Sequence, residues 1–334
     1  MPNLRCLAVR GAASARVVMM TMALVQGGLA FGAESGSPGA ASPATVNAVE
    51  IAAGVYLLPG LPGEVDANTL GRVGNAGFIV GSRGVLAIDT GTSYLHGRAL
   101  LDAIRRVTDR PVRMAIVTHT RQEFLFGGAA FREQGIPIAM HSDAAGLMAS
   151  RCETCLKTLR TTLGEDAMRG TAMYKPDVRF TDPSRVEAAA LIGRPVQVLF
   201  FGHSSGPGDV AVFDTATGAL FAGGLLDAKR IPDVIDSDLR GWAAALRSLQ
   251  ALPLKVIVPG HGSAGPMRVV DEVERYLGDL EDRARTLLKA GVPLSEVADA
   301  TNLPDFAAWD QYDTVHRRNA AIVYLRVERE QLLK

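Results

Sequence analysis

This 334-residue sequence has no net charge, because 35 Lys and Arg balance 35 Asp and Glu. A zero balance gives no extended basic surface of the kind that binds nucleic acids or anionic membranes. Aromatic residues are scarce, at 6% of the chain, which argues against a stacking platform for single-stranded nucleic acid. Hydrophobic residues make up 48%, as in ordinary globular proteins. We therefore expect a small-molecule substrate or a protein partner, and no nucleic acid.

Charge is nearly missing from the first 33 residues, where Arg5, Arg10 and Arg16 are the only charged side chains. The stretch 17–30 is apolar, and small residues follow it. This pattern predicts a secretory signal peptide at 1–33. The alternative is a transmembrane anchor, but spanning takes about 20 apolar residues and this run is shorter. We expect a periplasmic protein with no stable membrane anchor, a disordered low-complexity linker at 34–48 and one domain at 49–334.

Cysteine is also rare, with three residues in the chain. Cys6 lies in the expected signal peptide, so Cys152 and Cys155 remain in the mature chain. In an oxidising compartment this pair predicts a local disulfide. One alternative is half of a zinc knuckle, which needs a second pair that the chain lacks. The other is a redox-active dithiol, which is typical of a thioredoxin-like βαβ context that the sequence does not show here.

Short apolar runs bounded by turn residues predict strands, and apolar residues at helical spacing predict helices. Ser93 is placed to cap the first long helix. Both halves of the chain run from strands to helices, which predicts two sheets face to face with helices outside, an αββα sandwich of the α/β class. The expected strands are 51–58, 75–80, 85–89, 112–117, 136–140, 195–202, 210–214, 219–223 and 255–258, and the expected helices are 95–107, 128–134, 143–163, 242–249, 269–290 and 314–333.

Three of the expected strands end in loops that contain a histidine. The strand 112–117 leads to His119 and Glu123, four residues apart, and both side chains can bind a divalent metal. The strands 195–202 and 255–258 lead to His203 and His261. Because α/β folds place ligand chemistry in the loops that follow their strands, these four residues are the candidate metal ligands.

Several short motifs in this order resemble the metallo-β-lactamase-fold hydrolases over residues 49–333. More narrowly, the chain resembles the exported zinc metallohydrolases found with quinoprotein (PQQ-dependent) dehydrogenase systems. The fold motifs are Thr118-His119, Gly127-Gly128, Gly202-His203, Gly208-Asp209 and Pro259-Gly260-His261-Gly262, and the segments similar to the narrower branch are 75–81, 85–91, 109–112, 125–131, 230–232, 239–242 and 316–319.

The resemblance implies two zinc ions about 3.5–4 Å apart that polarise a water molecule. The first ligand loop of the family reads Thr-His-x-His-x-Asp-His, and this chain departs from it after His119. Arg121 replaces the second histidine, Glu123 the aspartate and Phe124 the third histidine. Gly224 stands where the metal-bridging aspartate is expected. A two-metal site is therefore not expected, because glycine offers no carboxylate and a guanidinium beside a cation repels it.

Two interpretations remain open. In the first, His119, Glu123, His203 and His261 hold at most one zinc, and Arg121 and Glu123 serve a hydrolysis of esters or thioesters, with Arg121 as an anion clamp. In the second, the chain is a catalytically inactive pseudoenzyme that binds a partner in the quinoprotein system, and Arg121 pairs with Glu123. Whether the chain is an enzyme is left open at this point.

Other polar residues have simpler interpretations. Asp89 is expected to orient the His119 loop without touching a metal. Asp227 lies three residues beyond Gly224, too far to replace the missing bridge. We expect His96 to be a solvated helix residue and His141 to cap the next helix. His316, together with Asn319, is expected to tether the C-terminal helix.

Overall fold

The computed structural model describes residues 45–333, all of which belong to one compact unit, residues 40–334. The expected signal peptide and most of the expected linker lie outside the described residues. The first sheet has the strands in sequence order, antiparallel from β1 to β4 and parallel from β4 to β7. Its strands are β1 (Val49–Ala52), β2 (Val55–Leu58), β3 (Ala76–Val80), β4 (Val85–Ile88), β5 (Val112–Ile116), β6 (Ile138–His141) and β7 (Val178–Phe180).

The second sheet has four strands in the order β11-β10-β9-β8. β8 (Val196–Phe200), β9 (Val210–Asp214) and β10 (Ala219–Asp227) are antiparallel neighbours, and β11 (Val256–His261) runs parallel to β10. β10 is long and has two register shifts before it ends opposite β11, where Asp227 pairs with His261. These irregularities decide which side chains meet at the end of the sheet.

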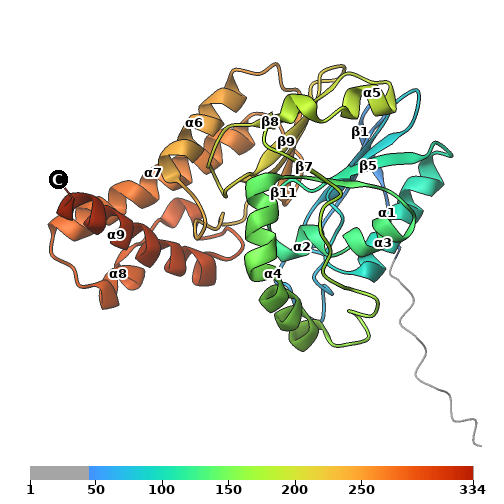
Figure 1. The fold of residues 1–334 in the computed structure, drawn as a ribbon. Coiled ribbons are helices and arrows are strands. Elements are labelled where there is room, and N and C mark those ends of the chain that lie inside the picture. The colour runs from blue at the N-terminus through green and yellow to red at the C-terminus, as the bar shows by residue number, and fades with distance from the viewer. Residues whose placement is uncertain (1–44, 334) are drawn as a thin grey trace, which may run out of the picture. The chain divides into compact units, whose positions relative to one another are not determined.

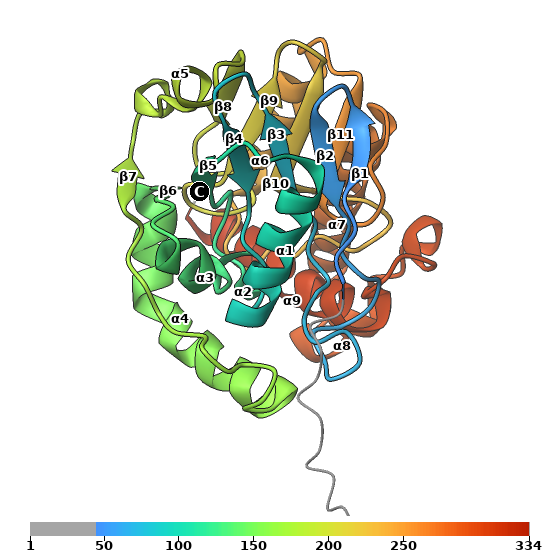
Figure 2. The ribbon, with the colours of Figure 1, turned by 90° about the vertical axis from the view of Figure 1, so that its right-hand side faces the viewer.

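The helices cover the outer faces of the two sheets (Figures 1 and 2). α1, α3 and α4 pack on the first sheet, and α6, α7 and α9 pack on the second. A third apolar cluster lies between the sheets, with Ile116 and Ile88 from one side and Val212 and Val258 from the other. The helices are α1 (Tyr94–Val107), α2 (Gln122–Leu125), α3 (Gly128–Glu133), α4 (Ser142–Leu163), α5 (Ala188–Ile192), α6 (Leu239–Gln250), α7 (Arg268–Lys289), α8 (Leu294–Ala300) and α9 (Arg317–Leu332).

The expected αββα sandwich is confirmed, and so are both predicted hairpins, β3–β4 and β9–β10. Ser93 caps α1 as predicted, and its hydroxyl accepts a hydrogen bond from the backbone N–H of His96 at 3.2 Å. The expected single strand at 51–58 is wrong. Gly54 adopts φ of 71° there, so the chain turns and forms two antiparallel strands, β1 and β2.

Three histidines outside the cavity have structural roles. His141 caps α4, as predicted. His316 tethers the C-terminal helix as predicted: its Nε2 contacts the Thr301 carbonyl at 2.9 Å and its Nδ1 contacts the Tyr276 hydroxyl at 3.1 Å. The prediction for His96 is wrong, because it is buried against the turn before α1 and burial lowers its pKa to about 3.

No helix between residues 45 and 333 is long and apolar enough to cross a membrane.

Candidate functional site

A cavity of about 420 Å³ opens where the loops after β5, β10 and β11 meet. A volume of this size is within the range of small-molecule sites. Three of the four predicted metal ligands, His119, Glu123 and His261, line it, together with Arg121. The C-terminal part of the chain completes the wall through Gln311, Val315 and Arg318.

The turn that carries His261 is held from the first sheet. Asn75, just before β3, donates from its side-chain amide to the carbonyls of Pro259 and Gly262 at 2.9 and 2.8 Å. Its backbone N–H also donates to the carbonyl of Gly260 at 2.8 Å. These bonds between distant segments fix the backbone on both sides of His261.

His119 is oriented by a buried acid, as predicted for Asp89. The Asp89 carboxylate accepts from the backbone N–H of Thr118 at 2.8 Å and from its hydroxyl at 2.9 Å. That hydroxyl also lies 2.8 Å from Nδ1 of His119. Burial and the nearby Arg121 lower the pKa of His119 to about 3, so this imidazole is neutral at physiological pH.

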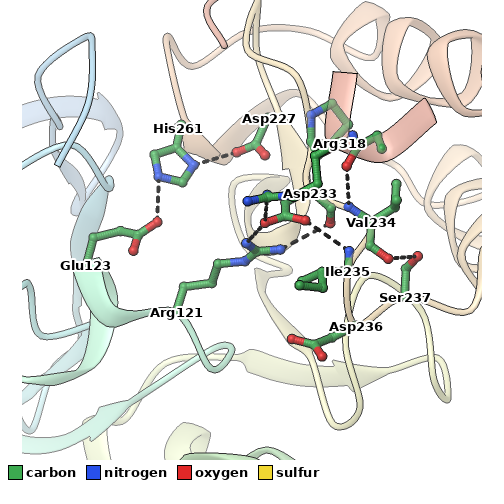
Figure 3. A network of polar contacts seen from close by, with 12 residues as sticks. Arg121, Glu123, Asp227, Asp233, Val234, Ile235, Asp236, Ser237, His261 and Arg318 are labelled. Atoms are coloured by element: carbon green, nitrogen blue, oxygen red, sulfur yellow. Dashed lines mark hydrogen bonds and ion pairs between the residues drawn. The ribbon is translucent and has the colours of Figure 1, made fainter. Parts of the chain in front are cut away.

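His261 lies between two carboxylates, as Figure 3 shows. Its Nδ1 is 2.7 Å from Oδ1 of Asp227, and its Nε2 is 3.2 Å from Oε1 of Glu123. The contact between Nε2 of His261 and Oε1 of Glu123 has the length of a hydrogen bond but not its alignment. It is therefore an ion pair, and the buried Nε2 makes no directed hydrogen bond. All three side chains are at most 13% exposed.

Charge in this group is shared between the ring and the two acids. Burial by itself lowers the pKa of His261, but Asp227 and Glu123 outweigh it and the net shift is upward. Burial raises the pKa of Glu123, but the contact with His261 and the charge of Arg121 bring it down to about 2. The two carboxylates therefore favour the imidazolium form of His261.

Arg121 does not pair with Glu123, contrary to the expectation for an inactive relative. Its Nη1 is 2.7 Å from Oδ2 of Asp233, and its Nη2 donates to the Asp233 carbonyl at 3.1 Å. Arg318, at the start of α9, reaches the same carboxylate oxygen at 2.5 Å. Burial opposes the charged form of Arg121, but Asp233 outweighs it and raises the pKa of the guanidinium. Two guanidinium groups thus share one acid beside the cavity (Figure 3).

His203 lies apart from the other three predicted ligands. It is exposed, and its Nε2 is 2.6 Å from the carbonyl of Asp236. It borders a separate hollow between α6 and α9, with Arg240 and Arg326. The loop 202–209 is longer than the family pattern expects.

The positions where the family carries further ligands hold other groups. The ring of Phe124 packs between the two imidazoles, with its centroid 4.2 Å from that of His119 and 5.1 Å from that of His261. A Cβ atom at Gly224 would lie 2.9 Å from Oδ2 of Asp209 and 2.9 Å from the His119 ring. Asp209 therefore fills part of the space that an aspartate at 224 would need.

Zinc is the metal that the resemblance implies, so the donor atoms decide whether it fits. Within the described part of the chain no group of three or more His, Cys, Asp or Glu side chains is arranged to hold a metal ion. The nearest arrangement is the pair of Glu123 and His261. Two ligands of one tetrahedral zinc at about 2.0–2.1 Å are about 3.3 Å apart, close to the separation of these two atoms. Two donors are available, and the residues present do not fit a two-metal site.

The structure does not contain the predicted disulfide between Cys152 and Cys155. Cys152 and Cys155 lie on α4 and are free thiols. Helix residues three apart have Cβ atoms about 5–6 Å apart, whereas a disulfide needs about 3.5–4.5 Å. In the structure both thiols are therefore unbridged on one continuous helix. Cys155 lines the cavity, and Cys152 is buried behind it.

Sequence reasoning missed two acids of the site. At three residues beyond Gly224, Asp227 is predicted to lie too far away to take part, but the register shifts of β10 bring it opposite His261. Asp233 was not singled out at all. The sequence holds one signal for Asp227. The apolar run 219–226 leads directly to this acid, as the apolar strand β11 leads to His261. No local pattern around Asp233 predicts its contact with Arg121, because 112 positions separate them.

Comparison with known proteins gives one family and one fold. The family model for the Metallo-beta-lactamase superfamily matches residues 69–261. A linear primary-alkylsulfatase from a Pseudomonas species is 23% identical over 271 residues, which are 69% of this chain and 50% of the relative. The chain thus spans about half the length of the curated relative it matches.

Two solved structures show the same fold at low identity. A metallo-beta-lactamase from Pontibacter korlensis has a TM-score of 0.57 and 24% identity, over 70% of this chain and 99% of that one. The DIM-1 metallo-beta-lactamase, in a crystal exposed to ceftazidime, has a TM-score of 0.54 and 14% identity, over 70% and 97%.

Proposed function

The chain belongs to the metallo-beta-lactamase superfamily and is hydrolase-like in fold, and we propose that its cavity binds a small anionic molecule without the two-zinc chemistry of that family. The observation that carries this proposal is the closed group Glu123–His261–Asp227. In this group Asp227 takes Nδ1 of His261, Oε1 of Glu123 stands 3.2 Å from Nε2, and His203 lies elsewhere.

The guanidinium groups on the cavity wall, which stand there beside acids such as Glu64 and Asp227, support the proposed preference for anions. Arg121 offers five N–H donors in a planar fork, of which Asp233 takes two. Arg318 and Arg230 also line the cavity. Guanidinium groups match the oxygens of carboxylates, sulfates and phosphates. The name of the curated relative refers to alkyl sulfates, and a sulfate ester is an anion that such a wall suits.

Export and a role beside a quinoprotein dehydrogenase belong to the same proposal. The N-terminal 33 residues support export, and the branch motifs support the association with a quinoprotein system. In this role the chain is an accessory protein that holds a small anion or its carrier in the periplasm.

A second candidate is a hydrolase with a single metal ion, and one observation favours it. Oε1 of Glu123 and Nε2 of His261 have the spacing of two ligands of one zinc, and Asp227 orients His261 through Nδ1 as an outer carboxylate does at zinc sites. Zinc bound there would act as a Lewis acid on an ester or thioester carbonyl. Arg121 would then hold the anionic end of the substrate.

The first experiment is metal content of residues 34–334, measured by elemental mass spectrometry after dialysis against a mild chelator. We expect zinc well below one ion per folded chain. The second is calorimetric titration with butyl sulfate, with butanol as the uncharged control. We expect binding of the sulfate alone, weakened by about 10- to 150-fold in Arg318→Gln, since a hydrogen bond to a charged group is worth about 1.5–3 kcal/mol.

Arg317→Gln is the matched control, because Arg317 is next in sequence but pairs with Asp299 on the surface. Its affinity for butyl sulfate should equal that of the unmodified protein. About one zinc per chain together with ester turnover would replace the binding proposal with the single-metal hydrolase. Equal binding of butyl sulfate and butanol would contradict the anion site.

A further inference from the structure

Two polar networks line the cavity, and they are opposite in character (Figure 3). One holds two carboxylates around a single imidazole, so it has hydrogen-bond acceptors to spare. The other holds two guanidinium groups around a single carboxylate, so it has donors to spare. The first network is Glu123, His261 and Asp227, and the second is Arg121, Asp233 and Arg318. The cavity therefore offers a ligand two unlike ends.

Glu123 carries unused acceptors of the first network. Its side chain is nine-tenths buried, at 10% exposure, and lines the cavity. Within residues 45–333, the side chain in contact with its carboxylate is His261, whose Nε2 lies 3.2 Å from Oε1 without the alignment of a hydrogen bond. An ionised carboxylate can accept about four hydrogen bonds, and a buried charge is costly unless it is hydrogen-bonded. A donor that enters the cavity therefore meets acceptors that the protein leaves open.

Arg121 and Arg318 carry the unused donors of the second network. Each guanidinium has five N–H donors. Arg121 makes two contacts with Asp233, one to the carboxylate and one to the carbonyl, and Arg318 makes one. The two arginine side chains are 28% and 48% exposed, so their remaining N–H groups can reach a molecule in the cavity.

The two networks approach each other at the start of α2, where Arg121 and Glu123 are two positions apart. Opposite charges this close in sequence could neutralise each other, but they do not pair. Arg121 contacts Asp233, and Glu123 contacts His261. A ligand with only an anionic group would leave the acceptors of Glu123 unused, and a ligand with only a cationic group would leave the guanidinium donors unused.

We propose that the molecule held in this cavity is a small zwitterion, with its anionic group at Arg121 and Arg318 and an ammonium group at Glu123. The inference rests on the proposed anion site and adds a cationic end to its ligand. An ammonium group brings three N–H donors and needs no fixed coordination geometry. A metal ion at the same place would lack a third ligand, because no group of three metal-binding side chains occurs in the described part of the chain.

The test is calorimetric titration of the folded protein near neutral pH with butyl sulfate and with aminobutyl sulfate, which carries an amino group at the end opposite the sulfate. We expect aminobutyl sulfate to bind about 10- to 150-fold tighter, as one hydrogen-bonded contact between charged groups provides. Its acetylated form, which lacks the positive charge, should bind like butyl sulfate. Butylamine, which lacks the sulfate, should bind more weakly than aminobutyl sulfate.

Three variants locate the two ends of the ligand. In Glu123→Gln the side chain keeps its shape and loses its charge, so the advantage of aminobutyl sulfate over butyl sulfate should disappear. Arg318→Gln should weaken both sulfates by the same factor and keep that advantage. Glu153→Gln is the matched control, because this acid is exposed on α4 away from the cavity, and it should change neither affinity. Circular dichroism confirms that each variant is folded, and the acetylated probe tests the charge without any variant.

The outcomes separate this inference from the anion site on which it rests. Equal affinities of the two sulfates for the unmodified protein, an acetylated form that binds as tightly as the amino form, or an advantage that persists in Glu123→Gln would each overturn the zwitterion and leave the anion site standing. If neither sulfate binds, both proposals are wrong.

Discussion

The substitution Asp227→Asn tests the charge that holds His261 in the cavity. The asparagine keeps the shape of the side chain and an oxygen that can accept from Nδ1 of His261, so the change removes mainly the negative charge. Oδ1 of Asp227 lies 2.7 Å from that nitrogen, and both side chains are at most 13% exposed. An opposite charge this close shifts a pKa by about 1–3 units, at 1.36 kcal/mol per unit. We expect a loss of about 1–4 kcal/mol while His261 is charged.

The pH dependence of this loss has a definite sign. The pKa of His261 is raised in the folded protein, so its contribution is complete below the unfolded value of about 6.5 and disappears as the pH rises through the folded value. Glu123 has its pKa lowered to about 2, so its contribution is present above about 4.5 and is lost as the pH falls through the folded value. The group is therefore most stabilising between about pH 4.5 and 6.5.

The assay is urea unfolding of both proteins at about pH 5.5 and about pH 9, with the pKa of His261 followed by NMR. The difference in unfolding free energy between the two proteins should be larger at the lower pH. Asp305→Asn is the control, because its pair with Arg275 is exposed and contributes little. A loss that is equal at both pH values, or larger at the higher one, would refute the assignment of His261 as a buried imidazolium.

Two further substitutions test the arginine wall and the glycine at the strand end. In urea unfolding, Asp233→Ala should lower the unfolding free energy by about 2–3 kcal/mol, because it leaves Arg121 without its charged partner. Asp299→Ala, which removes a surface ion pair with Arg317, should lower it by less than about 1 kcal/mol in the same assay. Gly224→Asp should destabilise by about 1–3 kcal/mol and gain no zinc, because its Cβ would stand 2.9 Å from a buried carboxylate oxygen. As a control, Gly146→Ala should stabilise the protein by about 0.5–1 kcal/mol, because Gly146 is a helix glycine with open space around it. A Gly224→Asp variant that is stable and binds zinc would contradict the proposed site.

The sequence by itself determined the sandwich and the location of the cavity. Short apolar runs bounded by turn residues, hairpin turns and amphipathic helices are local patterns, and they predicted most of the strands and long helices. His119 and His261 follow buried strands, and strand ends gather at one edge of a sheet, so their approach could be predicted without coordinates. The capping roles of Ser93 and His141 are also local, since each bonds to a backbone group within three residues.

The tertiary structure alone decided which charges meet. The register shifts in β10 bring Asp227 to His261, and no sequence pattern encodes the position of a bulge. Arg121 finds Asp233 and Arg318 through the packing of α9 against the loop after β10, because ion pairs between distant segments depend on the placement of whole elements. His203 faces outward, where its Nε2 contacts the Asp236 carbonyl. Cys152 and Cys155 lie on one helix as free thiols, although their spacing in sequence predicted a disulfide.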